Sequence, residues 1–234
     1  MATHSLSEKA YLHIRERVFS GEFAPGSQLV NRTLAAEVGT SFIPVREAIS
    51  RLASEGIVEQ VAGAGAFVKQ FDRQEISEIY DVRELFEPFA AGEAARLITS
   101  HELSELKSIL TDWESLGARI GKKKRGANEA DLDHWLTLNE RFHEIVITAS
   151  RNRILSRFTS GMQVLSQCFA AHRGSPKLLS PELVRRTIDS HRSLYQSLEA
   201  RKSEAAAAIV REQLKHGRLA ILQFFDQTRS NPSK

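Results

Sequence analysis

The distribution of glycine and proline constrains the fold of this 234-residue chain more than any other feature. These residues are dense from Gly21 to Gly65 and sparse from Val68 to His172. Glycine and proline separate short elements, whereas a long stretch with few of them allows long helices. The contrast predicts two domains, one over residues 1–70 and one over residues 71–230, with a boundary near residue 70.

The amino-terminal region contains three segments with apolar residues at helical spacing. They predict a helix over residues 6–20, a second that starts near Asn31 and a third from about Phe42 to Glu55. Asn31 and Ser41 are candidate caps for the second and third helices. Pro44 falls in the first turn of the third helix, where a missing N–H group costs nothing.

A β-hairpin is predicted directly after the third helix. Gly56 ends that helix, and two β-prone runs, residues 57–61 and 66–69, flank a glycine-rich tip. The order is therefore helix, helix, turn, helix, hairpin. This order predicts a winged helix-turn-helix.

From Asp72 onward the pattern is helical almost throughout. Pro88 is expected to kink the first long helix or divide it in two. Ser100 is a candidate N-cap for the next helix, although Leu103 stands where a capping box requires Glu or Gln. Further helices are expected at about residues 130–148, 152–172, 180–200 and 202–227. A bundle of six or seven helices is the economical interpretation, so the whole chain is predicted to be mainly α.

Composition limits the compartment and the partners. The chain has a single cysteine, Cys168, which excludes an internal disulfide and fits a reducing cytoplasm. The amino terminus has no apolar signal segment, and no apolar run approaches the roughly 20 residues of a membrane span. We therefore expect a cytoplasmic protein that does not bind a membrane. The net charge of +3 only weakly suggests an acidic partner.

The third helix carries an arginine one turn from its amino-terminal end. In a helix-turn-helix that end enters the DNA major groove, and the planar fork of Arg46 suits guanine O6 and N7. Ser41 can touch a phosphate, Arg32 can reach the backbone or a base, and Gly63 allows close approach of the hairpin tip to the minor groove. The alternative is that Arg46 is an ordinary surface residue.

Bulk charge does not decide between these two interpretations of Arg46. Residues 1–70 contain seven Lys or Arg and seven Asp or Glu, so their charges cancel. A DNA-binding surface in this domain must arise from uneven placement of charge.

Residues 11–68, YLHIRERVFSGEFAPGSQLVNRTLAAEVGTSFIPVREAISRLASEGIVEQVAGAGAFV, resemble the DNA-binding domain of the GntR family of bacterial transcription regulators. The resemblance implies DNA contacts from Arg32, Ser41, Phe42, Ile43, Pro44, Arg46 and Gly63. The family usually has arginine in place of Phe42 and often threonine in place of Ile43, so a hydrogen-bond donor is missing here. Phe42 can instead contact a thymine methyl group, or it can pack against another helix.

Residues 72–227 resemble the FadR-like branch of that family, whose all-helical effector domain is called FCD. The resemblance rests on YDVRELFEPFAA, NERFHEIVITASRNRIL and SHRSLYQSLEARKSEAAAAIVREQL. It implies a site for a divalent metal, such as zinc or nickel, formed by one Asp and three His. The corresponding residues here are Asn139, His143, His191 and Gln213, so two of the four ligands are amides, which bind such metals poorly. His216 is a possible substitute for Gln213.

Two interpretations of this site stay open. In the first, His143, His191 and Asn139 hold a metal together with weak amide or water ligands. In the second, the four residues bind an effector directly without a metal. Arg83 lies where the family often has an arginine close to this cavity and can pair with an effector carboxylate, or it forms a salt bridge to Glu84 or Glu87 on its own helix.

The resemblance implies a ligand-responsive transcription factor. Such a protein binds a palindromic double-stranded operator as a homodimer and is a repressor released by a small organic acid, although activation is also possible. One alternative is a metal-dependent enzyme that uses His143 and His191. Another is a DNA-binding protein that does not respond to an effector.

Overall fold

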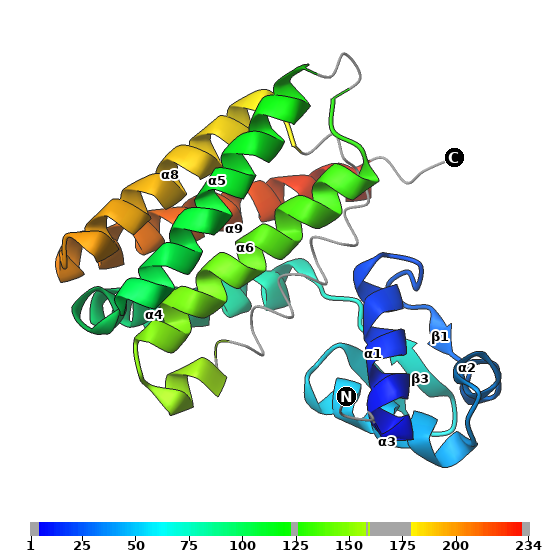
Figure 1. The fold of residues 1–234 in the computed structure, drawn as a ribbon. Helices are drawn as coiled ribbons and strands as arrows, with labels where there is room; N and C mark the ends of the chain where they lie inside the picture. Colours follow the sequence, from blue (N-terminus) through cyan, green and yellow to red (C-terminus); the bar gives the residue numbers. More distant parts are fainter. Residues whose placement is uncertain (1–4, 123–125, 158, 160–178, 231–234) are drawn as a thin grey trace. The chain divides into compact units, whose positions relative to one another are not determined.

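The computed structural model describes residues 5–122, 126–157, 159 and 179–230. These residues divide into two compact units, the first ending at Gln70 and the second beginning at Phe71. Figure 1 shows the elements of both units. The first unit contains α1 (Leu6–Phe19), β1 (Gln28–Leu29), α2 (Asn31–Val38), α3 (Phe42–Ser54), β2 (Val58–Val61) and β3 (Gly65–Val68). The second contains α4 (Arg73–Leu97), α5 (Ser100–Lys122), α6 (Glu129–Ala149), α8 (Pro181–Glu199) and α9 (Ser203–Ser230).

The core of the first unit joins three helices to a small sheet. The apolar faces predicted from helical spacing are buried, including Ile14 on α1, Leu34 on α2 and Leu52 on α3. The sheet has the order β1-β3-β2 with antiparallel pairing, and Val58 lies opposite Val68 in the hairpin. The winged helix-turn-helix is therefore confirmed. The two-residue strand β1 was not predicted, because so short a strand has no period to detect.

The second unit is all-helical in the residues described. Helices α4 and α9 pack along each other, and α5 packs against both α6 and α8 (Figure 1). Helix α4 runs unbroken through Pro88, so of the two predicted effects of this proline, a kink or a division, the division does not occur. The helix expected over residues 152–172 falls mostly outside the described residues. Within the described part of the chain, no helix is both long enough and apolar enough to cross a membrane.

Two predicted helix caps are corrected by the structure. Helix α2 begins at Asn31 itself, so Val30 occupies the cap position and supplies no side-chain bond. Helix α5 begins at Ser100, so its cap is Thr99. The Thr99 hydroxyl accepts a bond from the Glu102 amide (3.2 Å), and the Glu102 carboxylate accepts one from the Thr99 amide (2.9 Å). This is a complete capping box, one residue earlier than the prediction.

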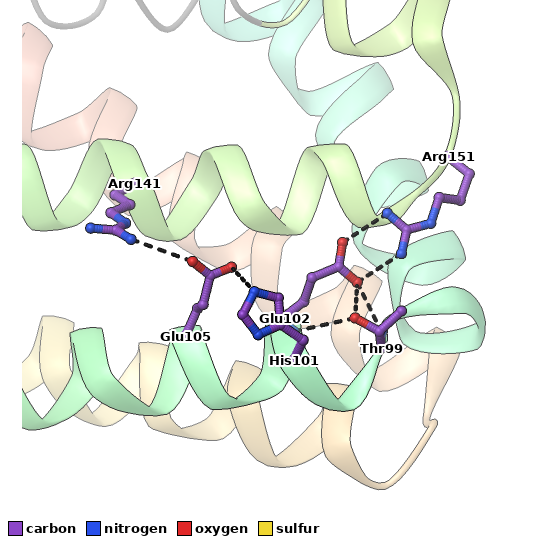
Figure 2. Close-up of polar contacts among 6 residues, drawn as sticks. All are labelled: Thr99, His101, Glu102, Glu105, Arg141 and Arg151. Atoms are coloured by element: carbon purple, nitrogen blue, oxygen red, sulfur yellow. Dashed lines mark hydrogen bonds and ion pairs between the residues drawn. The ribbon is translucent and has the colours of Figure 1, made fainter. Parts of the chain in front are cut away.

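The same capping box ties the start of α5 to the end of α6. Figure 2 shows Arg151 donating two bonds to the Glu102 carboxylate, at 2.7 and 2.8 Å. Partial burial raises the pKa of Glu102, but the bonds from Arg151 and Thr99 outweigh this effect and lower it. Arg141 of α6 also contacts Glu105 of α5, at 3.4 Å. These bonds hold α5 beside α6, the helix that carries His143.

Replacing Thr99 with alanine should lower the free energy of unfolding by about 1 kcal/mol, because the cap of α5 is lost. Ser100→Ala is the matched control, and it should change stability much less because Ser100 is not the cap. Urea unfolding followed by circular dichroism measures both. A larger loss for Ser100→Ala than for Thr99→Ala would contradict the assignment of the cap.

Candidate nucleic-acid interface and effector site

The amino-terminal end of α3 follows a tight connection from α2. Gly39 has a left-handed backbone conformation (φ 71°) after α2, which glycine adopts without steric cost. Ser41 then occupies the N-cap position of α3 in extended conformation, but its side chain makes no bond to the first helical turn. The position predicted for Ser41 is therefore right, and its capping bond is absent. Pro44 lies in the first turn of α3, as predicted.

Two arginines on the helix-turn-helix point to solvent. Arg32 in α2 and Arg46 in α3 are both exposed, and within the described residues neither side chain has a recorded ion pair or hydrogen bond. Glu47, the neighbour of Arg46, accepts a hydrogen bond from the Ser7 hydroxyl of α1. Both arginines are thus available to an external anion.

Other arginines of this unit neutralise its carboxylates. Arg17 binds Glu22 at 2.6 Å and also contacts Glu37. Arg51 binds Glu55 at 3.3 Å, and its guanidinium lies 3.6 Å from the centre of the Tyr11 ring. Although the unit carries no net charge, its unpaired arginines lie near the starts of α2 and α3, where the helix dipoles add positive potential.

The remaining predicted DNA-contacting residues are also accessible. Phe42 and Ile43, the first two residues of α3, are 54% and 68% exposed. A residue that packs between helices is buried in its own unit, so this exposure favours the DNA-contacting interpretation of Phe42 over the packing one. Gly63 lies between β2 and β3 with φ 77°, and no atom lies within 4 Å of the place where a Cβ would be. The wing can therefore approach a partner closely.

In the second unit the structure brings His143 and His191 together. Their Nε2 atoms lie 3.2 Å apart, with His143 on α6 half-buried and His191 on α8 only 3% exposed. The Nδ1 atom of His191 lies 2.8 Å from the carbonyl oxygen of Thr187. Because a carbonyl only accepts, His191 Nδ1 carries the proton, and in neutral His191 Nε2 must accept from His143 Nε2. The Nδ1 lone pair of His143 then has no recorded partner among the described residues.

Both histidines are neutral at physiological pH. Burial lowers the pKa of His143 to about 4, with a further contribution from the nearby Arg83 guanidinium. Burial and the proximity of His143 lower the pKa of His191 to about 3, against the opposing effect of the Thr187 carbonyl. The pair therefore offers fixed hydrogen-bonding positions and no charge.

Aromatic rings pack against the histidine pair. The Trp113 ring of α5 lies 4.4 Å from the His191 ring, and Phe142 lies edge-on to the same ring at 4.9 Å. Trp113 is fully buried, yet among the described residues its indole Nε1 has no hydrogen-bond partner. A buried polar atom without a partner carries a desolvation cost, which a bound polar molecule can remove. The sequence alone did not identify Trp113, because nothing in it shows which tryptophan is unsatisfied.

Gln213 contributes a second unsatisfied atom. Its amide nitrogen donates to the hydroxyl of Ser190, the residue before His191, at 3.0 Å. Its buried Oε1 has no partner within the part of the chain that the structure describes. Within the described ranges, Trp113 Nε1 is thus a donor without an acceptor, and Gln213 Oε1 is an acceptor without a donor. Asn139, four residues before His143 on α6, is half-buried, and no contact of its side chain is recorded in the described residues.

Arg83 forms a buried salt bridge on its own helix. Its Nε lies 2.6 Å from Glu87 Oε1, and both residues are buried. Burial opposes the charge of Arg83, but Glu87 and Tyr80 outweigh it and raise the pKa, so the guanidinium stays charged. Of the two predicted interpretations, the salt bridge to Glu87 is present in this structure. Arg83 is also close enough to His143 to affect its pKa.

These residues do not fit a zinc or nickel ion. Within the described ranges no three His, Cys, Asp or Glu side chains are grouped to hold a metal. The histidine pair supplies two imidazoles, and one of their Nε2 atoms carries the proton of the hydrogen bond between them. The other predicted ligands, Asn139 and Gln213, are uncharged amides, which are poor partners for these metals. The donor set therefore consists of neutral hydrogen-bonding groups and includes no charged ligand.

A winged helix-turn-helix with exposed arginines, followed by an all-helical unit, is an arrangement expected of a DNA-binding transcriptional regulator. The sequence model described as "Bacterial regulatory proteins, gntR family" matches residues 6–68, and that of the FCD domain matches residues 78–216. The chain belongs to the GntR family of transcriptional regulators and carries an FCD domain. The predicted family and fold class are confirmed. Because this family consists of regulators, the alternative of a metal-dependent enzyme is not supported.

Known relatives agree with this assignment. The gluconate operon transcriptional repressor of Bacillus subtilis is 28% identical over 189 residues, which is 80% of this chain and 73% of that protein. An uncharacterized HTH-type transcriptional regulator in an unstable DNA locus of Streptomyces ambofaciens is 30% identical over 134 residues, 57% of this chain and 52% of that protein. The chain thus matches only about half of the latter's length.

A solved structure shares the fold. The structure titled E. coli McbR/YncC superposes with a TM-score of 0.78 over 94% of this chain and 98% of that chain, at 23% sequence identity. At this level of identity the likeness establishes the fold alone.

The stability of the protein should fall as the pH drops below 6.5. The pKa values of His143 and His191 are about 4 and about 3 in the folded state, so between those values and roughly 6.5 the unfolded chain binds more protons. The stabilisation is fully present above pH 6.5 and is lost toward pH 4, by up to about 1.4 kcal/mol per pH unit for each histidine.

Urea unfolding at several pH values measures this loss. A variant with both His143→Gln and His191→Gln should show a shallower dependence, whereas His134→Gln, at an exposed position on α6, should keep the original slope. An unchanged slope in the double variant would show that the histidines are not neutral in the fold.

Arg46→Ala should weaken binding to the operator about 10- to 100-fold, because one base or phosphate contact is lost. Fluorescence anisotropy with an operator selected from a random duplex library measures the affinity. Lys9→Ala, which removes an exposed cation of α1, is the control and should have a much smaller effect. Equal affinities for Arg46→Ala and the unmodified protein would remove Arg46 from the interface.

Proposed function

We propose that this regulator is a homodimeric repressor that leaves a palindromic operator when a small hydroxy acid binds in its helical unit. The proposal depends on the neutral His143–His191 pair and on the Trp113 ring that packs against His191. Among the described residues, Trp113 Nε1 and Gln213 Oε1 are buried without a hydrogen-bond partner. Such an arrangement is costly without a ligand and is relieved by one that supplies both a donor and an acceptor.

The chemistry of the cluster favours an acid that bears hydroxyl groups. Gln213 Oε1 and His143 Nδ1 can accept bonds from hydroxyl groups, while Trp113 Nε1 can donate to an oxygen. Asn139 adds an amide that donates and accepts. The gluconate operon repressor, one of the relatives, is named for a hydroxy acid of this kind.

Arg83 is the proposed anchor for the effector carboxylate. Its guanidinium is charged and buried close to His143, but Glu87 occupies part of it. An entering carboxylate therefore replaces Glu87 as the partner of Arg83. The Arg83–Glu87 ion pair of α4 is then formed without effector and broken with it. An effector shifts a population only through such a difference between two states.

DNA binding as a dimer requires a surface for a second copy. Leu85 and Phe89 lie one turn apart on α4 and are 72% and 54% exposed. Exposed apolar side chains on one face of a helix fit a protein–protein contact. A dimer formed through the helical units presents two α3 helices to two half-sites, which accounts for a palindromic operator.

Gluconate and related sugar acids should weaken operator binding about 5- to 150-fold, the usual range of coupling between two sites. Anisotropy of the selected operator duplex is measured with each acid and with the neutral sugar alcohol of the same length.

His143→Ala should bind DNA normally but lose this response, whereas His134→Ala should keep it. A chelator should leave the response unchanged, because no metal takes part.

Two outcomes would contradict the proposal. Operator binding that no acid of the panel alters would favour a protein that acts without an effector. A full response in His143→Ala would place the effector site elsewhere.

A further inference from the structure

The start of α3 carries two large apolar side chains that the fold does not use. Val45, Ile49 and Leu52 form the buried face of this helix, whereas Phe42 and Ile43 are 54% and 68% exposed. On the exposed face of α3 the other residues are polar, and two exposed apolar side chains there do not contribute to the core. Their position suggests that they contribute to binding instead.

Charge around these residues identifies the partner as duplex DNA. Phe42 and Arg46 are four residues apart, so they share one face of α3. Arg46 has no recorded ion pair in the described part of the chain, and neither has Arg32 on the preceding helix. An apolar pair flanked by free arginines at a helix amino terminus is complementary to a polyanion and not to an apolar protein groove.

Only one group in the major groove matches an apolar side chain. The base edges present donors and acceptors, except for the C5-methyl group of thymine. Phe42 and Ile43 can neither donate nor accept a hydrogen bond through their side chains. A base that faces them is therefore distinguished by its methyl group and not by its hydrogen-bonding pattern.

We infer that Phe42 and Ile43 read thymine C5-methyl groups in each half-site, next to the position contacted by Arg46. This inference rests on the proposed binding of a palindromic operator and adds the class of base that the half-site contains. Removing one such methyl group should weaken binding about fourfold, the effect expected for one buried methyl.

Replacement of thymine by uracil tests the inference, because it removes the methyl group and keeps every hydrogen-bonding atom. The full-length protein is first used to select an operator from a random duplex library. Each thymine of the half-site is then replaced by uracil in turn, and affinities are measured by fluorescence anisotropy. Thymines outside the half-sites are the control for general effects of uracil on the duplex.

We expect at least one thymine of the half-site to show the loss. Phe42→Ala or Ile43→Ala should bind the thymine and uracil operators equally at that position. Leu12→Ala, which removes an exposed aliphatic side chain of α1, should keep the full sensitivity. Circular dichroism verifies that the variants are folded.

Failure of the inference differs from failure of the proposed function. A selected operator whose half-sites lack thymine, or whose affinity uracil does not change, overturns methyl reading while DNA binding stands. Uracil sensitivity that persists in both Phe42→Ala and Ile43→Ala also overturns it. A selection that enriches no sequence overturns operator binding, and methyl reading falls with it.

Discussion

The amino-terminal unit contains as many carboxylates as basic residues. Unpaired carboxylates near α3 would repel the phosphate backbone of DNA. The fold reduces this repulsion because some of its arginines form ion pairs with these carboxylates. Arg17 and Arg51 each bind more than one carboxylate, and Glu47 is held by a hydroxyl group of α1. Among the described residues, Arg32 and Arg46 have no recorded ion pair, and both are on the helix-turn-helix. A unit with zero net charge thus acquires a local positive surface through pairing geometry.

Helix boundaries in this protein could be predicted from the sequence more closely than its ion pairs. Helix α3 was placed closely because its apolar spacing, Pro44 and Gly56 all indicated the same boundaries. The sequence also contains Thr99 and Glu102 at capping-box spacing, but the prediction started the box one residue later. Which arginines are free could not be predicted, because their partners lie far away in the sequence. Arg51, for example, binds Glu8 of α1.

The resemblance identified part of the residue cluster that we propose as the effector site. His143 and His191 were identified by resemblance, and the structure brings them into contact. Their protonation depends on Thr187 and on burial, and neither can be read from one sequence. Trp113 was missed because a buried tryptophan usually satisfies its indole N–H, whereas among the residues that the structure describes this one has no partner. The packing of α5 on α8 was equally hidden: a Cβ on Gly117 would lie 2.8 Å from Ile188.

The amides at positions 139 and 213 change the physical basis of ligand recognition. An aspartate and a third imidazole would hold a cation, and that cation would attract most carboxylates with little regard to their other groups. Here the histidines are neutral, Arg83 is balanced by Glu87, and the remaining groups are hydrogen-bonding atoms. A site built to bond hydroxyl groups rejects an analogue that lacks them, because its buried polar atoms are then left unpaired. The proposed site should therefore discriminate among acids by their hydroxyl groups more strongly than by their charge.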